Sequence, residues 1–147
     1  MFTVSHIAIA VRNVEESSAQ FARLFGIEPK EFVVRIAPSE GVRLAEKVVG
    51  GVEFEFMEPL GDSSPISSFL EKRGEGIHHI CFEVDEIGKV FENLKARGVR
   101  LLSDEVKSLE DYYYFFVHPK SAGGILIEFK EKRKETKEIK DGSETDK

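Results

Sequence analysis

His6-Ile7-Ala8-Ile9-Ala10-Val11 and His79-Ile80-Cys81-Phe82-Glu83-Val84 are two versions of one short sequence, set 73 residues apart. A second pair has the same spacing: GGVEFEF begins at Gly50 and GGILIEF at Gly123. Two separate matches in one register indicate a duplicated unit, and this period is too long for a solenoid repeat. The sequence therefore predicts two copies of one supersecondary structure.

Each copy has the pattern strand, helix, then three strands. Alternating Ile7, Ile9 and Val11 predict the first strand, and a helix follows from its cap Asn13 to Gly26. The second copy repeats this, with Asp85 as the expected helix cap and Gly98 as the end. The further expected strands are Glu31–Ile36, Val42–Val49 and Val52–Met57 in the first copy, and Arg100–Leu102, Tyr112–Val117 and Ile125–Lys130 in the second.

The predicted fold is α+β: two tandem βαβββ modules, related by a pseudo-twofold axis, that form one curved mixed sheet. We place the first module at about 3–60 and the second at about 77–130, within a single domain 1–130. Ser64 and Pro65 start a linker helix at about 64–73, because serine caps helices and proline suits the first turn. The charged segment 131–147 is expected to be a disordered tail.

Composition narrows the range of partners. The 147 residues carry a net charge of −6, which argues against nucleic acid as a partner because phosphate binding needs a basic face. No apolar run approaches the roughly 18 residues of a membrane span, so no membrane partner is expected. The single cysteine, Cys81, cannot form an internal disulfide, which favours a reducing compartment and a cytoplasmic location.

The repeat also organises four polar residues, because His6 matches His79 and Glu55 matches Glu128. Side chains alternate between the two faces of a strand, so the four project away from the helix side of the sheet. If the modules meet about a twofold axis, the four side chains converge. Imidazole and carboxylate together favour a borderline divalent ion: Co²⁺, Mn²⁺, Ni²⁺, Fe²⁺ or Zn²⁺.

Several longer motifs resemble a known family. Gly76-Ile77-His78-His79-Ile80 and His118-Pro119-Lys120-Ser121 are its most specific features, beside the Met57–Leu60 and Ser64–Ile66 stretches. With them the sequence resembles the vicinal oxygen chelate superfamily of glyoxalase and bleomycin-resistance-like proteins, and within it the methylmalonyl-CoA epimerases. The resemblance covers about residues 3–130 and implies the glyoxalase-like fold.

The resemblance implies an isomerase that interconverts (2R)- and (2S)-methylmalonyl-CoA by removing and returning the proton at C2 through a metal-stabilised enolate. It implies one divalent ion, Co²⁺ preferred, on His6, Glu55, His79 and Glu128. Glu128 is the first candidate base, and Glu55 or Glu46 the second. Lys120 is either a substrate-binding residue, for a phosphate or the free carboxylate, or an ordinary surface lysine. We also expect an acyl-CoA substrate and a homodimer.

Other functions of the same fold stay open. A glyoxalase I-type isomerase uses the same kind of metal cluster on a glutathione hemithioacetal. A ring-cleaving Fe²⁺ dioxygenase needs two histidines and one carboxylate, so a fourth ligand at Glu55 argues against it. A metal-free drug-binding module needs no ligand set. Near the expected site, His78 is expected on the helix side or at the strand mouth, and Cys81 as a small buried residue of the pocket face.

Overall fold

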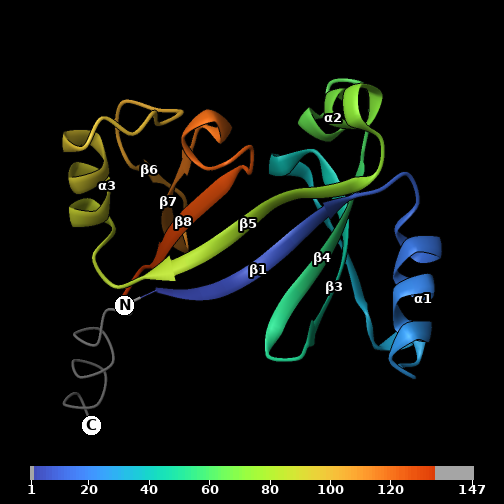
Figure 1. Ribbon diagram of the computed structural model, residues 1–147. Helices are drawn as coiled ribbons and strands as arrows, with labels where there is room; N and C mark the ends of the chain where they lie inside the picture. The colour runs from blue at the N-terminus through green and yellow to red at the C-terminus, as the bar shows by residue number, and fades with distance from the viewer. Residues whose placement is uncertain (1, 135–147) are drawn as a thin grey trace, which may run out of the picture.

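The two-module architecture is visible in the computed structural model, which describes residues 2–134 (Figure 1). Over these residues one eight-stranded sheet has the order β2-β3-β4-β1-β5-β8-β7-β6. Each module contributes four neighbouring strands, so the order within the second module mirrors that of the first. The predicted α+β class with tandem βαβββ modules in a curved mixed sheet is confirmed.

The element bounds follow the predicted pattern closely. In the first module these are β1 (Phe2–Ala10), α1 (Val14–Leu24), β2 (Val33–Ala37), β3 (Val42–Val49) and β4 (Val52–Pro59), with 3₁₀ turns η1 (Pro29–Glu31) and η2 (Pro38–Glu40). The linker helix is α2 (Pro65–Arg73). In the second module they are β5 (Gly76–Val84), α3 (Ile87–Ala96), β6 (Lys107–Ser108), β7 (Tyr112–Val117), η3 (Pro119–Ser121) and β8 (Ile127–Lys132).

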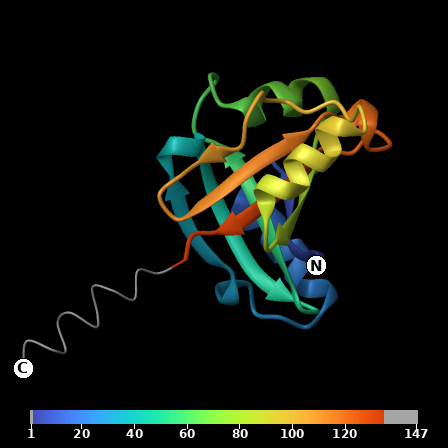
Figure 2. The ribbon, with the colours of Figure 1, turned by 90° about the vertical axis from the view of Figure 1, so that its left-hand side faces the viewer.

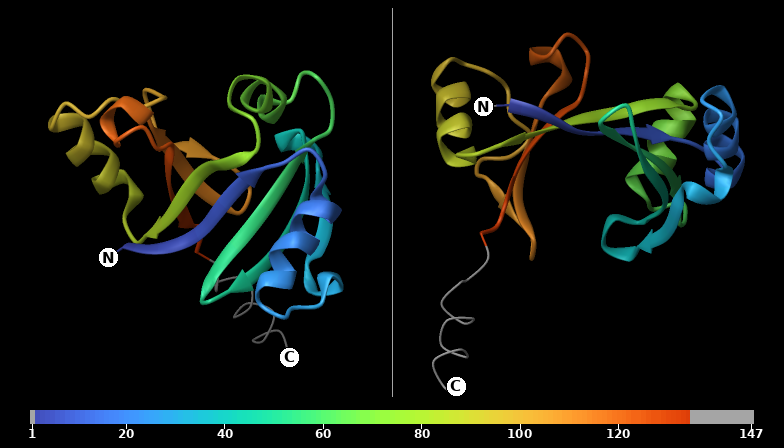
Figure 3. Two further views of the ribbon diagram at one scale, coloured as in Figure 1. Left: turned by 45° about the vertical axis from the view of Figure 1, so that its right-hand side comes forward. Right: turned by 90° about the horizontal axis from the view of Figure 1, so that it is seen from below.

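The modules meet along one seam, where β1 pairs antiparallel with β5. On either side of the seam the pairing is parallel, β1 with β4 and β5 with β8. Figures 2 and 3 show the outer strands of both modules bending to the same side, so that the sheet forms a trough. The helices α1 and α3 lie at the two ends of the molecule, one on each module (Figure 3).

Three apolar clusters hold the helices to the sheet. One packs α1 against β3 and β4 through Val14, Ala22, Ala45 and Phe56. A second packs α3 against the second module, its own, through Phe91, Phe115 and Val117. The third packs α2 against the opposite face of the first module, through Ala8, Ala10, Leu44, Met57, Ile66 and Leu70. Because strand side chains alternate, α2 covers one end of the concave face while α1 lies on the convex face.

Each long helix begins on a carboxylate from the last strand of its own module. The backbone N–H of Val14 donates to Glu58 Oε1 at 3.0 Å, and that of Ile87 donates to Glu131 Oε1 at 2.9 Å. Glu58 and Glu131 are 73 residues apart, so this contact belongs to the repeat. An anion at a helix N-terminus satisfies an orphan donor and interacts favourably with the helix dipole.

Two local expectations were wrong. Glu86, not Asp85, is the N-cap of α3, and it makes no side-chain cap bond because Glu131 supplies the acceptor. The expected strand Arg100–Leu102 is reduced to a single bridge from Leu101 to Val117. A turn follows at once, in which Ser103 Oγ donates to the Glu105 carbonyl at 2.7 Å, and it ends the pairing.

The C-terminal strand continues past residue 130, where we expected the domain to end. β8 continues to Lys132, and the Arg133 guanidinium then donates to the Leu109 carbonyl at 2.8 Å. Of the tail expected over 131–147, residues 135–147 lie outside the described residues. Among residues 2–134, no helix is both long enough and apolar enough to cross a bilayer.

Candidate metal and acid–base site

Strand register brings the candidate residues together in two rows across the concave face. In one row Glu53, His6, Cys81, Glu128 and Phe116 are successive partners on β4, β1, β5, β8 and β7. In the other row Glu46, Glu55, Ala8 and His79 are partners on β3, β4, β1 and β5. Residues from six strands therefore share one patch at the seam between the modules.

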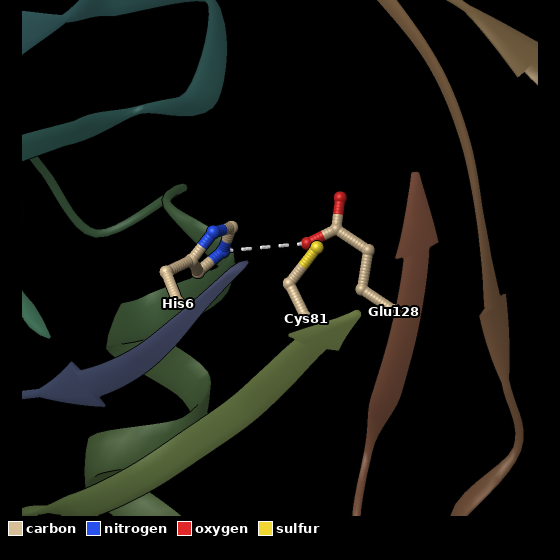
Figure 4. A group of neighbouring side chains, drawn as sticks. All are labelled: His6, Cys81 and Glu128. Carbon is tan, nitrogen blue, oxygen red and sulfur yellow. Dashed lines mark ion pairs between the residues drawn. The ribbon is translucent and has the colours of Figure 1, made fainter. Parts of the chain in front are cut away.

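His6, His79 and Glu128 form a tight buried triangle. His6 Nε2 lies 3.2 Å from His79 Nε2, and Glu128 Oε1 lies 3.2 Å from His79 Nε2 and 3.6 Å from His6 Nε2. All three residues are at most 8% exposed. Figure 4 shows the His6 and Glu128 side chains, and the Cys81 thiol between their strands, directed toward one another.

Glu128 is held as an anion in this triangle. Burial by itself raises its pKa, but hydrogen bonds from His6 and His79 and their charges outweigh burial and lower the pKa to about 2. A buried carboxylate flanked by two imidazoles is stable only with such partners. The arrangement therefore concentrates negative charge and two ring nitrogens at one point.

Glu55 lies on the other side of the His6 ring. Its Oε2 is 3.7 Å from His6 Nδ1, whereas the triangle uses His6 Nε2. Burial, a hydrogen bond with Glu53 and the negative charges of Glu53, Glu46 and Glu40 raise the pKa of Glu55 to about 9. Glu55 therefore favours the protonated form in the metal-free protein, the reverse of Glu128.

Glu46 reaches the same face but is already paired. It stands directly opposite Glu55 in the β3–β4 register. The Arg35 guanidinium donates to its carboxylate at 2.8 Å from Nε and 3.4 Å from Nη2. The geometry thus places Glu46 next to Glu55 and outside the triangle.

Lys120 is not part of this patch. It lies in the exposed turn η3, where its backbone N–H donates to His118 Nδ1 at 3.0 Å. Cys81 is fully buried within the patch, and burial raises the pKa of its thiol. Its sulfur, a His6 nitrogen and a Glu128 oxygen lie within 4.8 Å of one another.

Sequence reasoning missed two residues of this face. Glu53 is one, and its signal was available, since it shares the strand parity of Glu55. The other is Phe116 of β7, which contacts the His79 ring with 5.7 Å between centroids. Tyr114 contacts Phe116 at 6.0 Å and Tyr112 at 5.8 Å, which continues the wall along the strand.

The donor set fits a divalent ion. Metal–nitrogen and metal–oxygen bonds of about 2.0–2.2 Å at right angles place two donors roughly 3 Å apart. The triangle edges of 3.2, 3.2 and 3.6 Å are close to that separation. Two imidazoles with carboxylates suit the borderline ions of the first transition row.

The comparisons with known proteins agree with this fold. The family model of the Glyoxalase/Bleomycin resistance protein/Dioxygenase superfamily matches residues 5–117. The chain therefore belongs to that superfamily.

Within it, the chain is similar to epimerases. It is 38% identical to the mitochondrial methylmalonyl-CoA epimerase of Homo sapiens, over 87% of this chain and 73% of the relative. It is 37% identical to the ethylmalonyl-CoA/methylmalonyl-CoA epimerase of Cereibacter sphaeroides, over 87% of this chain and 96% of the relative. The crystal structure of methylmalonyl-CoA epimerase from Mycobacterium tuberculosis superposes with a TM-score of 0.74 at 30% identity, covering 89% of this chain and 88% of that one.

Proposed function

We propose that this protein is an epimerase that interconverts (2R)- and (2S)-methylmalonyl-CoA. The relatives that match almost the whole fold carry this activity in their names, and one of them also names ethylmalonyl-CoA. The substrate class is therefore a 2-alkylmalonyl thioester. Its C2 proton is flanked by a thioester and a carboxylate, which makes it removable by a carboxylate base.

One observation carries the proposal: two carboxyl groups contact the His6 ring from opposite sides. Glu128 meets Nε2 at 3.6 Å and comes from the second module, whereas Glu55 meets Nδ1 at 3.7 Å and comes from the first. Epimerisation needs a proton removed from one side of C2 and returned on the other. Carboxyl groups that approach from opposite modules provide this geometry.

We assign His6, His79 and Glu128, whose donor atoms form the triangle, as residues that would hold one divalent ion, with Co²⁺ as the first candidate. Glu55, the expected fourth ligand, would have to turn from the Nδ1 side of the His6 ring to reach that ion. When bound, the ion supplies Lewis-acid stabilisation of the negative charge that develops on the substrate oxygens. Glu128, next to the ring nitrogens, is then a weak base, so its buried position and alignment with C2 matter more than its basicity.

The remaining roles follow from position. Glu128 is the first proton carrier, and Glu55 or its neighbour Glu46 the second. Arg35 holds the Glu46 carboxylate at its place on the sheet. Lys120, exposed on η3, meets a phosphate or the free carboxylate of the acyl-CoA.

We also propose a homodimer in a reducing compartment such as the cytoplasm. The edge strand β2 exposes Val33, Val34 and Ile36, and an uncovered apolar edge favours pairing with a second copy. The buried Cys81 is a free thiol, as a reducing compartment requires. Size-exclusion chromatography with light scattering tests the dimer, and a monomer at micromolar concentration contradicts it.

The activity is tested by incubating each methylmalonyl-CoA epimer with the protein in D₂O and following deuterium at C2 by NMR, with and without a chelator. Exchange that depends on added Co²⁺ is expected. Glu92→Gln, which alters an exposed carboxylate on α3, serves as the matched control and should exchange normally. Absence of exchange with methylmalonyl-CoA and ethylmalonyl-CoA, together with turnover of a glutathione hemithioacetal, contradicts the proposal in favour of glyoxalase chemistry.

A further inference from the structure

The residue before each candidate ligand histidine points to the same side as that histidine. Ser5 Oγ lies 3.3 Å from His6 Nδ1, and His78 Nδ1 lies 2.9 Å from His79 Nδ1. In a regular strand, neighbouring side chains point to opposite faces and cannot meet in this way. Strand parity accordingly predicted His78 on the helix side or at the strand mouth.

Irregularities in the β1–β5 seam explain both contacts. The pairing moves from Val4↔Phe82 directly to His6↔Cys81, which leaves Ser5 unpaired. It also moves from Ala8↔His79 to Ile9↔Ile77, which leaves His78 unpaired. An extra residue of this kind is a β-bulge, and bulges turn side chains to new directions, often beside functional sites.

The two bulges are equivalent in the repeat. Ser5 and His78 are separated by the same 73 residues as His6 and His79. In both modules the bulge residue contacts Nδ1, while Nε2 faces the triangle with Glu128. The same device is thus present twice, with a hydroxyl in one module and an imidazole in the other.

We propose that Ser5 and His78 are positioning residues that contact the Nδ1 atoms of His6 and His79 and so orient the Nε2 atom of each toward the metal position. This inference rests on the metal site of the proposed function. A ligand histidine needs a partner for its second ring nitrogen, because that partner fixes both the ring orientation and the tautomer. With an ion bound, the Nε2 lone pair of His79 would face the metal, and its Nδ1 proton would be donated to His78 Nδ1, 2.9 Å away.

His78 is the stronger partner of the two. Its 2.9 Å contact is shorter than the 3.3 Å contact of Ser5, and its ring packs on Phe69 of α2 with 4.9 Å between centroids. His6 Nδ1 also has Glu55 at 3.7 Å, so loss of the Ser5 hydroxyl leaves a second neighbour at that nitrogen. A variant at position 78 should therefore have the larger effect.

The decisive variants separate hydrogen bonding from packing. His78→Phe keeps a ring against Phe69 but removes the acceptor, whereas His78→Gln keeps an acceptor oxygen. Ser68→Ala is the matched control, because Ser68 lines the same 360 Å³ cavity as His78. We expect Co²⁺ affinity, measured by competition with a chelator, to fall about 10- to 100-fold in His78→Phe. Smaller losses are expected in Ser5→Ala and His78→Gln, and none in Ser68→Ala.

A second readout needs no substrate. Long-range ¹H–¹⁵N NMR of the Zn²⁺-loaded protein should show the His79 Nδ1 proton protected from exchange with water by its hydrogen bond to His78, and His78→Phe should lose that protection. A freely exchanging His79 Nδ1 proton in the unaltered protein overturns the proposal, as does unchanged Co²⁺ affinity in a folded His78→Phe. If that variant fails to fold, the Nδ1 proton of the unaltered protein and the Co²⁺ affinity of His78→Gln still decide. Loss of epimerase activity alone bears only on the proposed function.

Discussion

The two modules have the same strand arrangement but place different side chains around their equivalent carboxyl groups. Glu55 and Glu128 occupy equivalent strand positions, but the residue opposite Glu55 is Glu46, whereas the residue opposite Glu128 is Phe116. Glu55 therefore has carboxylate neighbours and a raised pKa, while Glu128 lies between imidazoles with a lowered pKa. Duplication fixes where the two acids stand, and the neighbouring side chains determine their charge.

The largest expected difference between the modules concerns catalysis. Glu128→Gln should lower C2 proton exchange by at least about 10³-fold, because it removes a proton carrier and a candidate ligand together. Glu55→Gln should cost less, because an amide oxygen can still bind a metal ion. Exchange rates of both variants in D₂O, with Co²⁺ affinity measured alongside, check the order. Near-normal exchange in Glu128→Gln would remove it as the base.

The next contrast lies under the helices. Phe115 is fully buried against α3, and the equivalent position in the first module is the equally buried Ala45. Phe115→Ala should lower the free energy of unfolding by about 3–5 kcal/mol, because it leaves a cavity under α3 where the phenyl ring was packed. Urea denaturation measures this. A loss under about 1 kcal/mol would mean that neighbouring side chains of the second module close the cavity left by Phe115.

A smaller difference separates the two candidates for the second proton carrier. If Glu55 is that carrier, Glu55→Gln still exchanges the C2 proton of one epimer but slows interconversion by about 10²-fold, and Glu46→Gln does not. Starting from each pure epimer, NMR follows exchange, and chiral analysis of the product follows inversion. The reverse pattern assigns the role to Glu46.

The smallest contrast concerns the helix starts. Glu131→Ala should lower stability by about 1 kcal/mol, and Glu58→Ala by less. The reason is that α1 has a second cap, in which Asn13 accepts from the Glu16 N–H at 3.0 Å, whereas the N-cap residue of α3 makes no side-chain cap bond. Paired urea titrations resolve the order. Equal losses would show that the Asn13 cap adds nothing.

Most of the fold could be predicted from the sequence, because it follows from the alternation of side chains along the strands and from the 73-residue repeat. Alternation in Ile7–Val11 and the common offset of His6 and Glu55 from their partners are enough to predict the modules and the shared face. The expectation that failed for His78 concerns a residue that departs from this alternation. A bulge adds one residue without changing composition, so the turn of His78 toward His79 has no signature in alternation.

Other features depend on contacts between distant segments. The cap of α3 comes from Glu131, 44 residues away, so a search for local capping residues selected Asp85 instead. The electrostatic difference between Glu55 and Glu128 likewise depends on cross-strand neighbours, which only the register reveals. Lys120 was chosen by resemblance alone, and its role stays a prediction.

The bulged seam has a consequence for how the chain tolerates change. A slip of β1 against β5 by two residues would preserve which face each side chain occupies, yet it would carry His79 about 7 Å from His6. Two bulges at fixed places make such a slip costly, because each unpaired residue would then fall opposite a regular partner. Insertions or deletions of even one residue in either strand should therefore be rare among functional descendants, while the outer hairpins remain free to vary in length.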